Sequence, residues 1–561
     1  MPEQNTNFDA IVIGSGISGG WAAKELCEKG LKTLVLERGR MVEHKKDYPT
    51  ANYHPWDMPH RGNIPPPEMD KDPIVSNCYA YKEDTKHFFV KDNEHPYVQE
   101  KPFSWIRGYQ VGGKSLLWAR QTQRWSPFDF EAPKRDGFAV DWPIRYNDLS
   151  EWYSYVEKFV GISGNKDGLD TLPDGEFLPA WEMNCAEKII QQKIMEAFPD
   201  RHVVQGRCAH LTQPGVEHLL QGRGQCMARN LCARGCPFGA YFSSNSSTLP
   251  AAEKTGNLKI QTHAVVDSII YDEKLGKATG VKVVDALTHE VKIYTARIIF
   301  VNASCLNSNL ILLNSRSNYF PDGLGNKNGL LGKYIAFHNY RGNITAAFEG
   351  PLDQYYYGRR PTQLMMPSFR NVYKQDTDFL RGYMVHFSAS RGRPKVDGVG
   401  IDFKNAISEP GAWHIYMMMQ GETIPKVTNQ VYLSDYERDD WGIPQLVVNV
   451  DYDENDEKLL QDFFKEGKAM LEKAGCTNIN TWDSKQPPGL DIHEMGGVRM
   501  GRDEHTSLLN EYNQMHHCKN VFVTDGACMT STGNQNPSLT YMAITARAAE
   551  YAARQFKEGK L

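Results

Sequence analysis

The sequence predicts two architectures in one chain: an α/β domain in discontinuous pieces with a Rossmann-like parallel sheet, and an α+β domain built on an antiparallel sheet. Residues 9–20, DAIVIGSGISGG, form an apolar strand that runs into a glycine-rich turn and a helix. A similar strand, VFVTDGA at 521–527, stands just before a helix that closes the chain. Apolar and polar residues alternate with period two over 340–455, which is typical of an antiparallel sheet with one solvated face.

The N-terminal strand and turn predict a dinucleotide site. Gly14 makes the tight turn, Gly16 lets a pyrophosphate approach the backbone, and Gly19 lets the helix pack on the strand, while the helix N-terminus faces the phosphates. A second apolar strand, TLVLE, ends in Glu37, which is placed to bind the hydroxyls of a ribose. The glycine motif alone also fits a simple turn, but strand, glycines, helix, strand and acid in this order favour a bound dinucleotide.

Length and composition exclude several classes of protein. The 561 residues are too many for a single core and suggest two domains. The net charge is -5 and no basic stripe occurs, so we expect no nucleic-acid partner. No apolar run approaches the ~18 residues of a membrane span. The N-terminal MPEQNTNFDA enters the first strand directly and leaves no room for a signal peptide, so on this chain alone the cytoplasm is expected.

Four motifs, in order along nearly the whole chain, resemble the glucose-methanol-choline (GMC) oxidoreductase family. They are GSGISGG at 14–20, VGGKS at 111–115, DIHEMGGVRMG at 491–501, and DGA at 525–527 with NPSLT at 536–540. The resemblance implies that the dinucleotide is FAD and that the FAD-binding domain is discontinuous.

The resemblance also implies how the chain is divided. The FAD-binding domain is expected to comprise 1–40, 100–125, 200–340 and 490–561. The substrate-binding domain is expected to comprise 126–199 and 341–489. Residues 41–99, rich in Pro, His and aromatic side chains, are expected to form an extended excursion that serves as a lid or an interface.

The loop after residue 110 is implied to pass along the flavin. Gly112 and Gly113 permit a close backbone approach, and Ser115 follows them. In relatives resembling pyranose oxidases, a histidine of this loop, just before a tryptophan, is bonded covalently to the flavin. This sequence has Leu117 there, so we expect non-covalent FAD.

Further cofactor contacts follow from the resemblance. Val265 is expected to contact the adenine end through its backbone, and Ala303 to flank the cofactor. Asp525 and Gly526 are expected near the ribityl and phosphate end. The remaining implied cofactor residues lie at the start of the terminal helix and are Asn536, Pro537 and Thr540. Asn536 is expected to be the N-cap of this helix, and Pro537 its first residue. A helix N-terminus aimed at the flavin pyrimidine would stabilise the anionic reduced flavin.

His493 and Asn536 are the candidate catalytic residues. Oxidation of an alcohol by a flavin needs a base near neutrality, and the unperturbed histidine pKa of ~6.5 suits this task. His493 matches the family's catalytic histidine, and Asn536 matches its second member, which is His or Asn in relatives. Because asparagine is no base but can hydrogen-bond the substrate oxygen, His493 is expected to take the proton alone. The alternative is a structural histidine in a loop.

Three of the eleven cysteines are clustered. Cys226, Cys232 and Cys236 follow the pattern C-x5-C-x3-C, ended by Cys-Pro, which is the kind of tight loop that wraps sulfurs around one centre. The pattern resembles the cluster-bearing sugar dehydrogenases of the family, which implies a three-iron, four-sulfur (3Fe-4S) cluster on three thiolates. A Cys232–Cys236 disulfide, a zinc site short of a fourth ligand, and buried thiols without metal stay open as alternatives.

The implied function is an FAD-dependent dehydrogenase that oxidises a secondary hydroxyl of a sugar or glycoside, at C3 by similarity to glucoside 3-dehydrogenases. Electrons would leave through the cluster to a small, signal-bearing subunit or a cytochrome c, and such a partner would make the periplasm the compartment. Candidates for stacking on a sugar ring, with core packing as the alternative, are Tyr355, Tyr356, Tyr357, Trp413 and Tyr416.

Two other functions fit the sequence. One is an oxygen-dependent sugar oxidase, of the pyranose or C-glycoside type, in which the cysteines are structural. The other is a flavoprotein subunit that relays electrons without oxidising an alcohol. His493 and Asn536 argue against the second.

Overall fold

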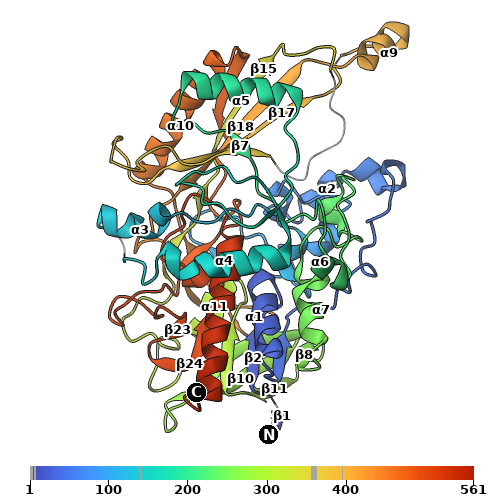
Figure 1. Cartoon of the computed structure of the whole chain (residues 1–561). Helices are drawn as coiled ribbons and strands as arrows, with labels where there is room; N and C mark the ends of the chain where they lie inside the picture. Colours follow the sequence, from blue (N-terminus) through green and yellow to red (C-terminus); the bar gives the residue numbers. More distant parts are fainter. Residues whose placement is uncertain (1–3, 6–7, 139, 355–362, 395) are drawn as a thin grey trace.

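The computed structural model describes residues 4–5, 8–138, 140–354, 363–394 and 396–561 (Figure 1). A lower half holds both termini and a parallel sheet, and an upper half holds a long antiparallel sheet. Among the described residues, no helix combines the length and the apolar character required to cross a bilayer. The mixed architecture matches the predicted combination of parallel and antiparallel sheets.

The lower half is organised around a six-stranded sheet, whose strand order is β23-β24-β12-β2-β3-β8. Its strands from β24 to β8 run parallel, and β23 pairs antiparallel to β24. Every residue of β2, β3 and β12 is buried, as expected for parallel strands covered on both faces. The strands are β2 Ala10–Ile13, β3 Thr33–Leu36, β8 Leu258–Gln261, β12 Ile298–Val301, β23 Gln514–Met515 and β24 Cys518–Val523.

Helices cover this sheet. Helix α1 (Ile17–Glu28) packs against α7 (Thr248–Glu253) and the terminal helix α11 (Ser538–Lys557). Helix α4 (Tyr146–Val160), which lies in the range predicted for the substrate domain, packs against α11. A second small sheet stands beside α8 (Cys305–Asn314) and contains β1 Gln4–Asn5, β9 Ala264–Asp272, β10 Lys277–Asp285 and β11 Val291–Thr295.

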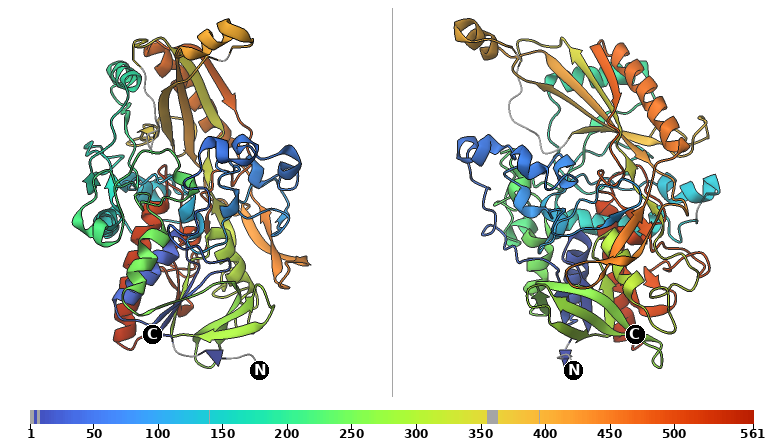
Figure 2. Two further views of the ribbon diagram at one scale, coloured as in Figure 1. Left: turned by 90° about the vertical axis from the view of Figure 1, so that its right-hand side faces the viewer. Right: turned by 180° about the vertical axis from the view of Figure 1, so that it is seen from behind.

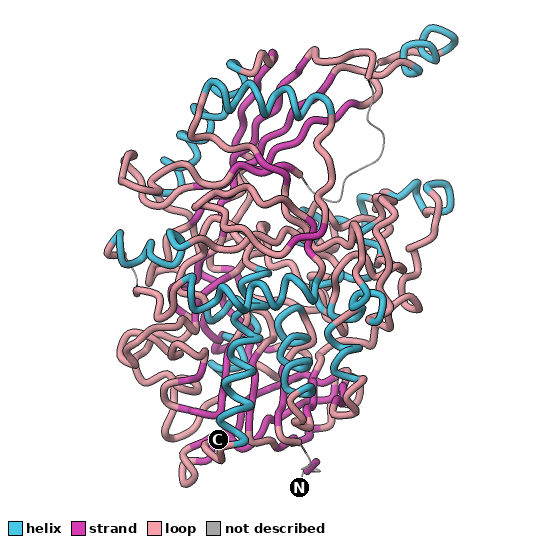
Figure 3. Tube along the Cα trace, in the orientation of Figure 1, coloured by secondary structure: helices cyan, strands magenta, loops and turns pink. Residues whose placement is uncertain are grey.

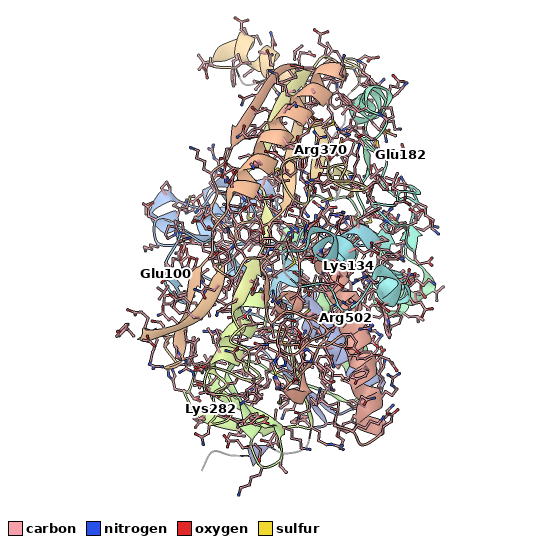
Figure 4. The ribbon with its side chains drawn as sticks, turned by 90° about the vertical axis from the view of Figure 1, so that its left-hand side faces the viewer. Glu100, Lys134, Glu182, Lys282, Arg370 and Arg502 are labelled. Atoms are coloured by element: carbon pink, nitrogen blue, oxygen red, sulfur yellow. The ribbon has the colours of Figure 1, made fainter. Side chains whose placement is uncertain are left out.

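The upper half contains the antiparallel sheet that the period-two pattern predicts. Helices α5 (Cys185–Ala197) and α10 (Glu454–Lys473) pack against its strands, and α10 ends just before Gly475. Arg370, labelled in Figure 4, binds Asp462 of α10 through two nitrogens at 2.9 Å. The strands are β7 Val204–Gln205, β14 His338–Asn339, β15 Gly342–Phe348, β16 Leu364–Met366, β17 Tyr383–Arg391, β18 Trp413–Glu422 and β21 Thr477–Asp483.

A five-stranded sheet shares the core of the lower half and draws on distant parts of the chain. It contains β4 Val98–Gln99, β13 Lys333–Ala336, β19 Gln430–Arg438, β20 Pro444–Asn449 and β22 Met495–Gly497. The short strands β5 Ile162–Ser163 and β6 Phe177–Leu178 pair elsewhere. The remaining helices are α2 Pro66–Met69, α3 Pro127–Asp136, α6 Val216–Leu220 and α9 Gly400–Ser408, the last of which projects from the upper half.

Residues 41–99 form an excursion with little regular structure, as predicted. Figure 3 shows mostly loop in this part of the chain, and Figure 2 shows it at middle height, between the two halves. Its buried residues, among them Tyr48, Val75 and Phe88, form a small core of their own with Ile106 and Leu116. The excursion is therefore a packed layer over the loops of the lower half.

Candidate active site

A cavity of about 1460 Å³ runs from the carboxyl ends of the parallel strands up to the antiparallel sheet. Its lower lining comes from the turn after β2, the end of β3 and the start of α8. Its upper lining comes from β17 and β18, and one side is formed by the cysteine loop at 226–234. Ligands of open α/β sheets bind at this edge of the parallel strands.

The glycine turn has the geometry that a pyrophosphate needs. A Cβ on Gly14 would overlap the carbonyl oxygen of Asn302, and one on Gly19 would overlap the carbonyl of Gly14. Gly16, in contrast, lines the cavity with nothing within 4 Å of an added Cβ. Gly16 is also the N-cap of α1, and no side chain caps that helix end. Free N–H groups therefore face an open space, which fits a phosphate.

Glu37 ends β3 at the same edge. Its carboxylate accepts hydrogen bonds from the backbone of Ser15 (3.2 Å) and Gly39 (3.0 Å), and it lines the cavity. Burial raises the pKa of this carboxyl. Val265 and Ala303 line the same part of the cavity, so three of the predicted contacts of the adenosine end lie together.

The 112–115 loop separates into shaping and lining residues. Gly112 has a φ of +93°, where a Cβ would overlap the Asn245 amide, and it does not line the cavity. Gly113 and Ser115 do line it. The Ser115 hydroxyl donates to the carbonyl of Gly112 at 2.5 Å, which closes the turn. Leu117 also faces the cavity.

Asp525 and Gly526 line the cavity from the end of β24. Asp525 accepts hydrogen bonds from the Ser308 hydroxyl (2.5 Å) and the Ala527 backbone (2.9 Å), and burial raises its pKa to about 6. A Cβ on Gly526 would overlap the Glu494 carbonyl oxygen. This turn therefore holds its shape through Asp525 and leaves no room for a larger residue at 526.

The start of the terminal helix differs from the prediction by one residue. Helix α11 begins at Ser538, and Pro537 occupies the N-cap position without a side-chain cap. Asn536 does not cap the helix because its amide points to His493 instead. Asn536 and Pro537 line the cavity, so the uncapped helix end faces it. Thr540 does not line the cavity, since its hydroxyl hydrogen-bonds Tyr153 in the core at 2.8 Å.

The two predicted catalytic residues lie together at the cavity wall. His493 Nε2 is 3.5 Å from Asn536 Nδ2, and both residues line the cavity. His493 Nδ1 is 2.8 Å from Nδ1 of His338, a buried residue that the sequence did not single out. Burial, with smaller effects of His338, Lys114 and His386, holds the pKa of His493 well below its ordinary value. The imidazole is therefore neutral near pH 7.

The backbone around His493 is tightly held. Asp491 Oδ2 accepts hydrogen bonds from the backbone N–H of His338 (3.0 Å) and His493 (3.1 Å), and its Oδ1 accepts one from Gly489 (3.0 Å). Ile492 has a φ of +64°, which is strained for a β-branched residue and typical of functional sites. Ligand atoms of His338, Asp491 and His493 lie within 4.8 Å of one another, but these hydrogen bonds already occupy them.

The upper end of the cavity is rich in polar side chains. Tyr416 lines it and donates to Asn343 Oδ1 at 2.7 Å. Trp413 is buried on the other face of β18, so its prediction as a sugar-stacking residue is wrong and the alternative, core packing, holds. Tyr355, Tyr356 and Tyr357 lie outside the described residues. Further polar lining residues are Tyr340, Gln363, His386, Ser388, Ser390, Arg391, Ser484 and Gln486.

The cysteine loop reaches the same cavity. Cys226 and Cys232 line it, and Cys236 is not part of its lining. All eleven cysteines fall within the described residues and none forms a disulfide, so the Cys232–Cys236 bridge is not made. Burial raises the pKa of the Cys226 thiol, and the thiols of Cys232 and Cys236 act in the same direction.

Comparisons with known proteins agree with this geometry. The sequence profiles of the GMC oxidoreductase family match residues 8–338 and 425–545. The chain is 29% identical to 2-methyl-1,2-propanediol dehydrogenase of Mycolicibacterium austroafricanum, over 98% of this chain and 96% of that protein. It is 25% identical to paromamine 6'-oxidase of Streptomyces fradiae, over 97% and 91%, and 25% identical to the fructose dehydrogenase large subunit of Gluconobacter japonicus, over 100% of both.

The two profile matches together span most of the chain, and the cavity fits a dinucleotide at the glycine turn, Glu37 and the uncapped start of α11. The chain therefore belongs to the GMC oxidoreductase family and is an FAD-dependent oxidoreductase that acts on CH–OH donors.

Proposed function

We propose that the protein is a dehydrogenase that oxidises a secondary hydroxyl of a sugar or glycoside, at C3 to give a 3-keto-glycoside, with non-covalent FAD and a 3Fe-4S cluster. The observation that carries the substrate class is the polar upper end of the cavity above His493 and Asn536. Amide, hydroxyl, imidazole and guanidinium groups from β15, β17 and β18 supply donors and acceptors for several hydroxyls at once.

The chemistry divides between cofactor and chain. Bound FAD would supply the acceptor for the hydride that leaves the C–H bond. His493 Nε2 takes the hydroxyl proton as the O–H bond breaks, because the neutral imidazole is a base at this pH. Asn536 Nδ2, 3.5 Å from that nitrogen, donates a hydrogen bond to the carbinol oxygen and holds it at the base. Leu117 in place of a histidine supports non-covalent attachment.

Arg223 supports an anionic centre at the cysteine loop. Its guanidinium is 1% exposed, donates to the carbonyl of Gly239 (2.8 Å) and to Gln221 Oε1 (3.2 Å), and leaves Nη2 without a partner. Within the described part of the chain, no carboxylate contributes to the pKa of Arg223. Burial lowers its pKa to about 9, and Cys236 acts to raise it. A buried cation requires a nearby negative charge, which thiolates bound to an iron-sulfur cluster supply.

A partner is proposed from the same loop and from one relative. The cluster would pass single electrons to a protein acceptor, either a small subunit or a cytochrome c. The Gluconobacter relative is named a large subunit, which supports a multi-subunit assembly for this chain. If that partner carries an export signal, the assembled enzyme acts in the periplasm, and otherwise in the cytoplasm.

The cluster is tested by anaerobic purification, iron and acid-labile sulfide analysis, and low-temperature EPR on wild type and Cys232→Ser. About three irons per FAD and a signal lost in the variant are expected. Cys476→Ser is the matched control, because Cys476 is a buried thiol of the upper half far from the loop. Iron-free anaerobic protein would refute the cluster.

The substrate class is tested by anaerobic flavin bleaching with methyl α-D-glucopyranoside, D-fructose and 2-methyl-1,2-propanediol. Bleaching by the glycoside, with the 3-keto product identified by NMR, is the expected result. The second candidate is an oxygen-dependent sugar oxidase, and the relative named paromamine 6'-oxidase favours it. Rapid formation of hydrogen peroxide in air, stoichiometric with sugar oxidation, would select the oxidase.

A further inference from the structure

His338 joins the loop at 530–536 to His493. It begins β14, which pairs with β18, and its side chain is fully buried. Its Nε2 is 3.0 Å from the carbonyl oxygen of Gly533, and its Nδ1 is 2.8 Å from Nδ1 of His493. The two rings stand nearly perpendicular, at 86°. The ring nitrogens of His338 are therefore held by Gly533 and His493, and the backbone of Thr532 also acts on the ring.

These contacts determine which nitrogen carries each proton. A carbonyl oxygen only accepts, so His338 Nε2 must carry the hydrogen that Gly533 receives. A neutral imidazole has one N–H, so His338 Nδ1 is a bare acceptor. Burial lowers the pKa of His338 to about 4, which keeps this ring neutral. The hydrogen between the two Nδ1 atoms therefore belongs to His493, and His493 Nε2 has a free lone pair.

The free nitrogen is the one that faces the cavity. His493 Nε2 lies next to Asn536, whose Nδ2 can only donate to a lone pair. The titratable groups around the ring are Lys114, His386, Tyr340, Asp491 and Glu494. Asp491 accepts only backbone hydrogens at this point, and Lys114 is paired with Glu494 at 3.3 Å. Within the described residues, the side-chain partner of His493 Nδ1 is His338, to which it donates its hydrogen.

We infer that His338 is a positioning residue that fixes His493 in the Nδ1–H tautomer and so leaves Nε2 bare to receive the substrate proton. This inference rests on the proposed role of His493 as base. When the hydroxyl O–H bond breaks, the proton forms a new N–H bond at Nε2, and Nδ1–H continues to donate to His338. That hydrogen bond becomes charge-assisted and stronger as the imidazolium forms. The proton returns to solvent from Nε2 once the ketone has left.

The tautomer is measured directly, without turnover, by ¹⁵N NMR of oxidised holoenzyme labelled at the histidine ring nitrogens, with His493 assigned by its loss in His493→Gln. In wild type, we expect a protonated Nδ1 and an unprotonated Nε2. In His338→Leu, the pattern is expected to change to Nε2–H or to a mixture. His218→Leu is the matched control, because His218 is also a buried histidine bound to two backbone groups. An Nε2–H tautomer in wild type would overturn the inference.

Kinetics separate positioning from a structural role. The first-order rate of flavin reduction by methyl α-D-glucopyranoside is expected to fall about 10²-fold in His338→Leu, with half-saturation and bound FAD unchanged. His338→Asn keeps a hydrogen-bond acceptor near Nδ1 of His493, so its rate of flavin reduction should be within about 10-fold of the wild-type rate. Equal losses in both variants, or an unchanged rate in His338→Leu, would contradict the assignment. A failed base hypothesis is recognised separately, by a normal rate in His493→Ala.

Discussion

Arg381 and Glu422 form an ion pair of 2.7 Å beneath the loop that carries Asn536, and both side chains are 1% exposed. Arg381 also pairs with the buried carboxylate of Asp136, and Glu422 accepts the backbone N–H of Gly533 at 3.2 Å. The carbonyl of that same Gly533 accepts from His338. A buried ionic network in the upper half thus supports the residues that hold the candidate base.

Removing the guanidinium of Arg381 should destabilise the folded protein. In Arg381→Ala, two buried carboxylates lose the guanidinium that they share, while Asp136 keeps its pair with Arg135 and Glu422 keeps the backbone N–H of Gly533. We expect a loss of about 3–5 kcal/mol in the free energy of unfolding, measured by urea denaturation. Lys458→Ala is the control, because its pair with Glu454 is exposed and should contribute less than about 0.5 kcal/mol. Equal effects of the two substitutions would show that the network adds no stability.

The glycine turn gives a contrast between folding and cofactor binding. Gly16→Ala should fold normally, since its φ is -66° and no atom of the chain lies within 4 Å of the new methyl group, but the methyl occupies the space facing the phosphates. The purified variant should contain much less FAD, measured by absorbance. Gly14→Ala should instead lower the melting temperature of the apoprotein, because its φ is +99° and its Cβ overlaps Asn302. Full FAD occupancy in Gly16→Ala would contradict the phosphate assignment.

The pH dependence of flavin reduction follows from His493. Burial holds its pKa well below the ordinary ~6.5, so the base stays free as the pH falls through that value. Stopped-flow reduction should keep its plateau rate down to about pH 6.5 and decline only at lower pH. The same shift removes folding stability as pH falls below ~6.5, because the unfolded chain then binds a proton that the folded chain does not. An acidic limb centred above pH 6.5 would refute the prediction.

The buried carboxyl of Asp456 predicts the opposite pH dependence of folding stability. Burial raises the pKa of this carboxyl at the start of α10 to about 8, so the folded protein holds a proton that the unfolded chain releases near pH 4. The contribution of Asp456 to the free energy of unfolding of the wild type therefore declines as pH rises from about 4 to 8. Asp456→Asn should gain stability relative to wild type across that range, by denaturation at several pH values. Glu454→Gln, an exposed acid of the same turn, should show no such gain.

Local motifs were sufficient to place the residues predicted for the cofactor end at the cavity. The roles of Gly14, Gly16 and Glu37 depend on a turn and two neighbouring strands, and all three lie where the sequence predicts, at the edge of the parallel sheet. The predicted start of α11 was wrong by one residue, because the Asn536 amide contacts His493, which comes from a distant segment, and does not cap its own helix.

Tertiary relationships could not be predicted in the same way. The period-two pattern of β18 separates Trp413 from Tyr416, but only packing shows that the tryptophan face meets the core and the tyrosine face meets the cavity. His338 lies 155 residues from His493 along the chain, and no local pattern connects them. Its importance depends on two hydrogen bonds that exist only in the folded molecule.

Strand order has a consequence for biosynthesis. In the six-stranded sheet, β2 and β24 both pair with β12, so two segments far apart in the sequence form neighbouring parts of one sheet. A ribosome-bound chain emerges N-terminus first and carries the glycine turn long before it carries Asp525 or the start of α11. The cofactor cavity is incomplete until β24 and the start of α11 have been translated. We therefore expect FAD to bind only after these elements have left the ribosome, and products truncated before β24 to lack the cofactor.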